Sequence, residues 1–174
     1  MTALDTNPIS LNLQSELNYR FVIMRAPATS FWCQSVKIPD VSLPPLKIPS
    51  PSLAIPMQGD HMVYNPLSLT FKVDDNLQNW LEIYNWLEGV GNPQNNSQKY
   101  INMENNKNYS GFGLYSDLQL FILDSQRNPT YVFTFERCSP TFLTGPNFQA
   151  TDNTVEYITS TATFSYAKYK ISLP

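Results

Sequence analysis

Residues 66–88 read PLSLTFKVDDNLQNWLEIYNWLE, and this stretch decides the fold class. In its first half Leu67, Leu69 and Phe71 alternate with polar residues, and this period of two residues predicts a strand with one buried face. In its second half the apolar residues recur every three or four positions, which predicts an amphipathic helix over residues 76–88. The strand is therefore expected to lead directly into the one clearly predicted helix.

The predicted helix carries a single apolar stripe, and we expect that stripe to pack on a sheet. Trp80 lies on the stripe and is expected in the core, whereas Trp86 lies off it and is expected to cover the helix flank or an interface. The stripe consists of Leu77, Trp80, Leu81, Tyr84, Leu87 and Val90.

Strand-forming segments flank this unit on both sides. Before it, residues 17–25 and 31–38 are rich in β-branched and aromatic residues, and each segment is followed by a proline. After it, residues 117–123 and 130–138 predict a hairpin, and residues 155–169 predict one long closing strand. The order of strands, one helix and further strands predicts a mainly β fold, an antiparallel β-sandwich or barrel with one flanking α-helix.

The chain is expected to form a single domain, residues 17–174, preceded by an N-terminal arm, residues 1–16. Long loops are expected at residues 39–66 and 92–113. The first is rich in prolines, which donate no backbone hydrogen bond, so it is predicted to be extended chain or a projecting hairpin. Its apolar residues are expected to contact a neighbouring subunit, and the predicted contacts are Leu43, Pro44, Leu46, Ile48, Leu53 and Ile55.

The composition points to a covered surface. Charged residues make up 14% of the chain, against roughly 25% in an average soluble domain, while aromatic residues make up 13%. The net charge is -3 and no cluster of Lys and Arg occurs, which argues against nucleic-acid and anionic membrane binding. Neither a signal peptide nor an apolar run of about 20 residues is visible, so we expect synthesis in a cytoplasm.

Residues for catalysis are scarce, and we expect no enzyme activity, no cofactor and no metal site. The single histidine, His61, follows a Gly-Asp turn and has no ligand partner at a suitable spacing. Cys33 and Cys138 stand far apart and are expected to be buried free thiols. The neighbouring Asp74 and Asp75 lie between the predicted strand and helix, where a structural role is favoured over a catalytic pair.

Four segments occur in an order that resembles the tail-tube proteins of contractile-tailed (myovirus) bacteriophages. They are residues 18–23 (NYRFVI), 31–39 (FWCQSVKIP), 66–74 (PLSLTFKVD) and 162–166 (ATFSY). This family includes the tube itself and tube-like initiator, terminator and baseplate rings. The resemblance implies a structural subunit that forms sixfold rings, stacked around a lumen through which DNA passes during ejection. It also implies contacts with the sheath, the baseplate and neighbouring tube rings, and a location in the virion tail after assembly in the host cytoplasm.

Strands with a polar alternate face are the candidates for such a lumen. We expect the wall to be neutral to negative, because a basic wall would hold the phosphates of passing DNA. The predicted lumen-facing residues are Ser68, Thr70, Thr159, Thr161, Thr163 and Ser165.

Other functions stay open at this stage. A tube protein of type VI secretion would share the fold and would form free hexamers in solution. A carbohydrate-binding β-sandwich would need its tryptophans and tyrosines exposed together on one face. A small hydrolase is disfavoured because His61 is the only histidine.

Overall fold

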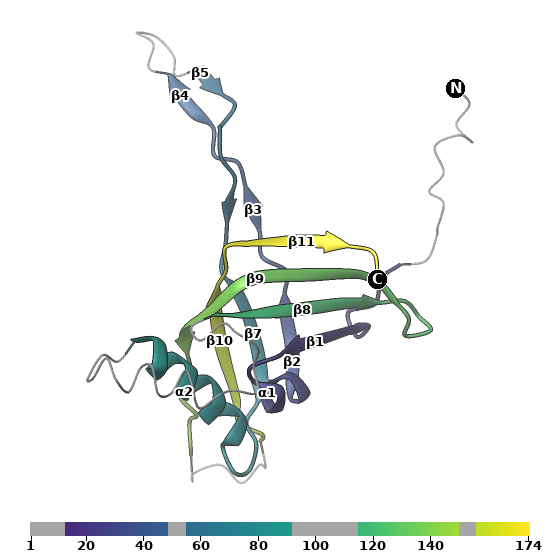
Figure 1. The fold of residues 1–174 in the computed structure, drawn as a ribbon, viewed down its shortest axis with the longest axis vertical. Coiled ribbons are helices and arrows are strands. Elements are labelled where there is room, and N and C mark those ends of the chain that lie inside the picture. Colours follow the sequence, from purple (N-terminus) through teal and green to yellow (C-terminus); the bar gives the residue numbers. More distant parts are fainter. Residues whose placement is uncertain (1–12, 49–54, 92–114, 150–155) are drawn as a thin grey trace.

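The computed structural model describes residues 13–48, 55–91, 115–149 and 156–174 (Figure 1). Expectations for residues 1–12, and for the loop at 92–113, fall outside these ranges. The elements in chain order are β1 (Tyr19–Ile23), α1 (Pro27–Phe31), β2 (Cys33–Lys37), β3 (Val41–Ser42), β4 (Leu46–Ile48), β5 (Ile55–Met57), β6 (Val63–Tyr64), β7 (Leu67–Lys72), α2 (Gln78–Gly91), β8 (Ser116–Leu123), β9 (Pro129–Leu143), β10 (Thr159–Ser165) and β11 (Lys168–Ser172).

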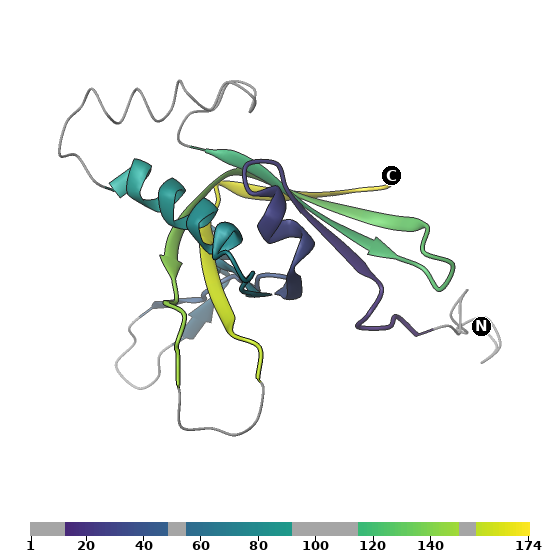
Figure 2. The same cartoon turned by 90° about the horizontal axis from the view of Figure 1, so that it is seen from below.

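The main strands form two antiparallel sheets that share the long strand β9. The strand order is β1-β8-β9-β10-β7-β2, and β11 also pairs with β9. The first part of β9 pairs with β8 and β11, and its last residues pair with β10. Figure 2 shows the two sheets diverging from this shared strand. The predicted class, a mainly β antiparallel fold with a flanking helix, is confirmed.

The corner of β9 lies at Arg137, whose φ of 56° interrupts regular strand geometry. The register between β8 and β9 shifts between Ser116 and Leu118, which is the pattern of a β-bulge. The closing segment breaks opposite the same corner, where the Ala167 amide donates to the Glu136 carbonyl at 3.0 Å. The prediction of one strand over residues 155–169 is therefore wrong, because β10 and β11 follow the two differently directed parts of β9.

The core lies between the sheets and the helices. On β7 the side chains of Leu67, Leu69 and Phe71 are buried, as their alternation predicted. Ala162 and Phe164 of β10 complete this buried face. The predicted hairpin of residues 117–123 and 130–138 is confirmed as β8 and β9, although β9 continues to Leu143.

Helix α2 packs through a face that differs from the predicted stripe. Its buried residues are Asn79, Ile83 and Trp86, while Leu81 and Tyr84 are exposed. The cause lies at the helix start, where Asn79 Nδ2 donates to the Lys72 carbonyl at 2.6 Å and Asn79 Oδ1 accepts from the Asp74 amide at 3.1 Å. These bonds fix a polar residue against the end of β7. Trp86 is then turned into the core, against Phe164, at a ring separation of 5.7 Å.

A short helix, α1, lies beside α2 and was not predicted from sequence. Because it has only five residues, it shows no helical periodicity. Thr29 is buried and donates its hydroxyl to the Asn79 carbonyl at 2.9 Å. The Glu82 carboxylate accepts from the amides of Ala28 and Thr29, and burial raises its pKa. A residue of α2 thus supplies the negative charge that the N-terminus of α1 lacks in its own first turn.

The described parts of residues 39–66, which are residues 39–48 and 55–66, form two sides of a projecting hairpin, here called the hairpin arm (Figure 1). Two short ladders build it, β3 with β6 near the sheet and β4 with β5 farther out. Pro56 lies opposite Lys47 in the outer ladder. At Gly59 a Cβ atom would meet the Pro44 carbonyl oxygen at 2.2 Å, so the two sides of the arm approach too closely for a side chain there.

Aromatic rings fix the base of the hairpin arm to the shared strand. Tyr64 lies edge-on to Tyr169 at 5.6 Å and to Tyr166 at 6.3 Å. The Tyr166 hydroxyl donates to the Asn65 carbonyl at 2.8 Å, and its ring contacts Phe135 of β9 at 5.2 Å. The arm therefore begins from a packed cluster and not from a free loop.

Candidate functional site

Two neighbouring strands, β7 and β10, bring the predicted lumen residues together on one face. Thr70 and Thr161 are directly opposite each other, with their Oγ1 atoms 3.3 Å apart. Thr163 lies opposite Ser68 on the same side of β7 and β10. Ser165 continues the row to Ser139 of β9, with the two hydroxyl oxygens 3.1 Å apart, and Thr159 lies opposite Lys72. We call this surface the hydroxyl face.

The hydroxyl face also carries two ammonium groups in the described residues. Lys37 lies opposite Ser68 and pairs with Asp40, with Nζ 2.8 Å from Oδ2. Lys72 lies over the ring of Tyr157, with Nζ 4.8 Å from the ring centre. The whole chain has a net charge of -3, whereas this face carries two positively charged side chains. Each of them has a close partner, Asp40 for Lys37 and the ring of Tyr157 for Lys72.

The hairpin arm exposes apolar side chains along its described length. Leu43 is 43% exposed, Leu46 is 55% exposed, and Pro44 is also exposed. Ile48 and Ile55 are paired with each other in the outer ladder, and Leu53 lies outside the described residues. Four further exposed apolar residues of the arm lie outside the set of predicted contacts, and they are Val41, Met57, Met62 and Val63.

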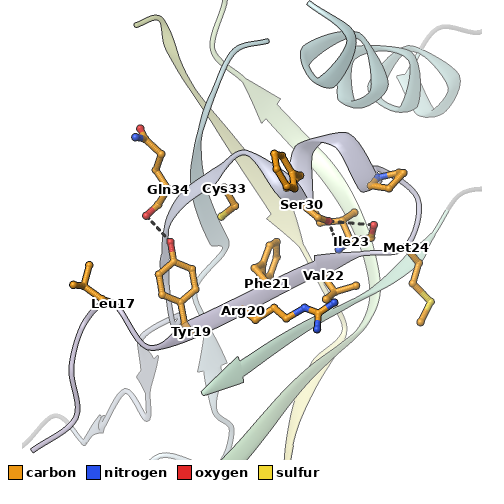
Figure 3. A pocket seen from close by; sticks show the side chains of 12 residues that line it. Leu17, Tyr19, Arg20, Phe21, Val22, Ile23, Met24, Ser30, Cys33 and Gln34 are labelled. Carbon is orange, nitrogen blue, oxygen red and sulfur yellow. Dashed lines mark hydrogen bonds between the residues drawn. The ribbon is translucent and has the colours of Figure 1, made fainter. Parts of the chain in front are cut away.

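A groove of about 720 Å³ lies between β1, α1 and the start of β2, and sequence reasoning did not find it (Figure 3). The Tyr19 hydroxyl crosses it and donates to the Gln34 carbonyl. At its other end Ser30 Oγ accepts from the Ile23 amide at 2.6 Å. Burial raises the pKa of the groove thiol, Cys33, to about 11, so this cysteine is a neutral thiol at physiological pH.

The residues considered for catalysis do not converge. His61 is exposed in its turn and lies 2.6 Å, Nδ1 to Oδ1, from Asp60. Cys33 and Cys138 are free thiols in different places, and burial raises the pKa of Cys138 to about 12. Within the described ranges, no group of three or more His, Cys, Asp and Glu residues could hold a metal ion. No described helix is long and apolar enough to cross a membrane.

The two tryptophans of α2 are separated by the fold, which contradicts a shared sugar-stacking platform. Trp86 is 1% exposed in the core. Trp80 is half-buried, donates from Nε1 to the Thr144 carbonyl at 3.0 Å, and stacks on Tyr84 with the rings 5.1 Å apart. The expectation that Trp86 is a flank or interface residue is wrong, whereas Trp80, expected in the core, is half-buried and packs against the edge of the core.

Comparison with known proteins gives one family match. The model of a family described as "T4-like virus tail tube protein gp19" matches residues 57–168, more than half of the chain. A comparison with curated proteins gives no match.

Solved structures show where the same fold occurs. A chain from the tube terminating cap of the anti-feeding prophage has a TM-score of 0.56 at 15% identity, with 99% of this chain and 100% of that chain covered. A chain from the sheath-tube complex of an extracellular contractile injection system, PVC, has a TM-score of 0.56 at 12% identity, with 94% of each chain covered. A chain from the anti-feeding prophage baseplate has a TM-score of 0.54 at 10% identity, with 94% and 97% covered.

Proposed function

The chain belongs to the T4-like virus tail tube protein gp19 family and is a structural tail tube subunit, and from this we propose that its copies close into sixfold rings that stack into a tube. Residues 17–174 would act as the ring-forming domain and residues 1–16 as an arm. The role is structural and not catalytic. Such a subunit would be assembled in the cytoplasm of the host and would belong to the tail of the virion.

The observation that carries this proposal is a hydroxyl-rich sheet face between two unpaired edges. In the described part of the chain, β2 pairs only with β7, so its other side is an open edge. The end of β9 near Leu143 pairs only with β10 and is the opposite edge. Open edges invite pairing with another chain, and closing six such sheets into a ring would pair both edges of this sheet. The hydroxyl face would then line the lumen.

A hydroxyl wall suits the passage of DNA without binding. The two cations of this face are partly neutralised or covered, Lys37 by Asp40 and Lys72 by the ring of Tyr157. Firm binding of DNA needs many free cations that displace counterions from the phosphates. We therefore expect no measurable affinity of the assembled ring for duplex DNA at physiological salt. The outer surfaces would contact the sheath, the baseplate and neighbouring rings.

The test is direct imaging of the purified full-length chain. Negative-stain microscopy should show rings, and cryo-electron microscopy should place Thr161 and Thr163 on the inner wall. A particle that stays monomeric at high concentration, or a ring whose inner wall is formed by β1 and β11, would contradict the proposal.

A cap, initiator or baseplate ring is the second candidate. The specific observation is the likeness to the tube terminating cap, which extends over nearly the whole of both chains. Both candidates predict rings, but a tube subunit should stack indefinitely whereas a cap or an initiator should stop after one or two layers. The length distribution of the assemblies separates them, and the free hexamers expected of a type VI secretion tube protein would appear as single rings.

A further inference from the structure

We propose that the groove between β1, α1 and β2 receives the hairpin arm of a second copy of this chain, and that this contact joins successive rings. The inference rests on the proposed ring assembly and adds the receiving surface, which neither the family match nor the sequence assigns. It follows from three features of the described residues: the groove, the arm and their positions at opposite ends of one strand.

The groove has the character of an unoccupied docking surface. Around its rim Leu17 is 87% exposed, Phe31 is 79% exposed and Met24 is 54% exposed. Apolar residues gathered in this way on the surface of one molecule indicate a contact with another. Arg20 is the only charged residue among those that line the groove. Figure 3 shows Leu17 beside the segment that leads into β1, and the Arg20 side chain along the strand near Val22.

The backbone of β1 is also available along this groove. The Asn18 carbonyl accepts from Leu123 at the end of β8, whereas both the amide and the carbonyl of Ile23 bond to Ser30 Oγ on the opposite side. Because residues of an antiparallel strand alternate in direction, Tyr19, Phe21 and Ile23 direct their backbone groups toward the groove. Those of Ile23 are already bonded to Ser30, so an incoming segment would use the groups of Tyr19 and Phe21. No described strand pairs with that edge. An incoming extended segment could therefore find hydrogen-bonding groups as well as apolar contacts.

The hairpin arm has the complementary character. Its inner half exposes Leu43 and Met62. Two exposed carboxylates lie in the same half, Asp40 beside Lys37 and Asp60 beside His61, and their charge is opposite to that of Arg20 in the groove. In the outer ladder Leu46 and Met57 are opposite each other and both are exposed. The arm is extended and projects from the sheet (Figure 1). Its eight residues from Val41 to Ile48 can span about 25 Å at the rise of a strand.

The arm and the groove cannot meet within one molecule. The groove lies where β2 begins, at Cys33, and the arm starts beyond the end of β2 at Lys37. The arm then runs away from the sheet and not back along it (Figure 1). A contact between opposite ends of identical subunits is a head-to-tail contact, and such contacts either close into a ring or repeat along an axis. Because the edges of the hydroxyl face are assigned to ring closure, we assign the arm-to-groove contact to stacking.

A cross-linking experiment tests the contact. Two full-length variants in a Cys33→Ser background, Phe31→Cys with a long affinity tag and Leu43→Cys with a short one, are mixed, assembled and oxidised. We expect a disulfide-linked pair of mixed size, roughly tenfold more abundant than with Phe148→Cys in place of Phe31→Cys, as for a residue at the centre of an interface. Phe148 is a matched control because it is 69% exposed and does not line the groove. Equal yields from Phe31→Cys and Phe148→Cys would overturn the proposal.

A second pair of variants separates this inference from the proposed function. Phe31→Ser should keep the melting temperature and the single rings of the wild type but lose stacking, whereas Phe148→Ser should stack normally. If the wild type forms no rings, the proposed function fails. If the wild type stacks and Phe31→Ser stacks equally well, the rings stand and only the arm-to-groove contact is refuted. Should Phe31→Ser melt at a lower temperature, the cross-link yields decide.

Discussion

The Asp117 carboxylate accepts a hydrogen bond from the Arg137 amide, with Oδ1 and N 2.9 Å apart, at the corner where β9 leaves one sheet for the other. Arg137 is in the left-handed region, with φ of 56°, which side chains with a Cβ rarely adopt. The bulge would leave this amide without a ladder partner, and Asp117 on the facing strand supplies one. The guanidinium of Arg137 also lies 5.0 Å from the ring centre of Tyr115.

The corner can be tested by comparing two substitutions at one position. Arg137→Gly and Arg137→Ala remove the same contact with Tyr115, but only glycine accepts the backbone conformation without strain. We expect Arg137→Ala to be less stable than Arg137→Gly by about 1 kcal/mol. Chemical denaturation of both variants measures the difference, and a more stable alanine variant would show that the corner is not strained.

The orientation of α2 predicts different costs for its two tryptophans. Trp86→Ala removes a buried ring from the core and should lower the free energy of unfolding by about 3–5 kcal/mol. Trp80→Ala removes a half-buried ring and one hydrogen bond, so its cost should be about 1–2 kcal/mol. Urea unfolding of the two variants provides the comparison. A larger loss for Trp80→Ala would restore the orientation expected from the apolar stripe.

The ion pairs that attach β11 to β9 should weaken as the pH falls. Hydrogen bonding from Lys170, with Nζ 2.5 Å from Glu136 Oε1, lowers the pKa of Glu136, and Lys168 lies 3.6 Å from the other oxygen. Because the folded state lowers this pKa, the pair stabilises the fold above the ordinary pKa of a glutamate, and the stabilisation is lost as pH falls through the lowered value. Thermal melts from neutral to acid pH should show a shallower decline for Glu136→Gln than for the wild type.

The contact of Tyr166 at the base of the hairpin arm should make the stability of the fold sensitive to alkaline pH. Burial raises the pKa of Tyr166 to about 12, and its hydroxyl donates to the Asn65 carbonyl. The folded state therefore favours the protonated phenol, so stability is complete below the ordinary pKa of tyrosine and is lost as pH rises toward 12. Tyr166→Phe should cost about 1 kcal/mol at neutral pH through the lost hydrogen bond. It should also reduce the alkaline loss of stability, which denaturation at pH values above 10 would reveal.

Positive charge on the hydroxyl face should convert a passive wall into a binding surface. The double variant Thr161→Lys and Thr163→Lys should still form rings, because both side chains lie on the face away from the core. Its affinity for duplex DNA should rise and should fall steeply as salt increases. Fluorescence anisotropy at several salt concentrations checks this. A matched Tyr131→Lys variant, exposed on β9, should bind DNA no better than the wild type. Equal affinity of the double variant and this control would remove the hydroxyl face from the lumen.

Local alternation predicted the strands well, because each depends on its own residues. The pattern around Leu67, Leu69 and Phe71 gave β7 and its buried face, and the turn between β8 and β9 was equally clear. The hydroxyl residues on β7 and β10 were found for the same reason, since the face opposite a buried row is fixed by the period of the strand. Whether that face lines a lumen stays a prediction.

Features that depend on contacts between residues far apart in the sequence could not be predicted from local sequence patterns. The rotation of α2 follows from the bonds of Asn79 to the end of β7, and periodicity alone favours the more apolar stripe. The break between β10 and β11 follows from the corner in another strand, at Arg137. The groove beside β1 arises only where α1 and β2 meet that strand, so no local pattern could indicate it.

Pro56 limits the pairing of the outer ladder of the hairpin arm with further strands. It lies in the middle of β5, opposite Lys47, and it has no amide hydrogen to offer on either side. A newly made subunit must carry an apolar, two-stranded ribbon in solution until its partners arrive, and ribbons of this kind can recruit one another into fibrils. With Pro56 in place, the β5 edge cannot extend that ribbon strand by strand. We therefore expect this residue to protect the unassembled protein from aggregation during the interval between synthesis and incorporation.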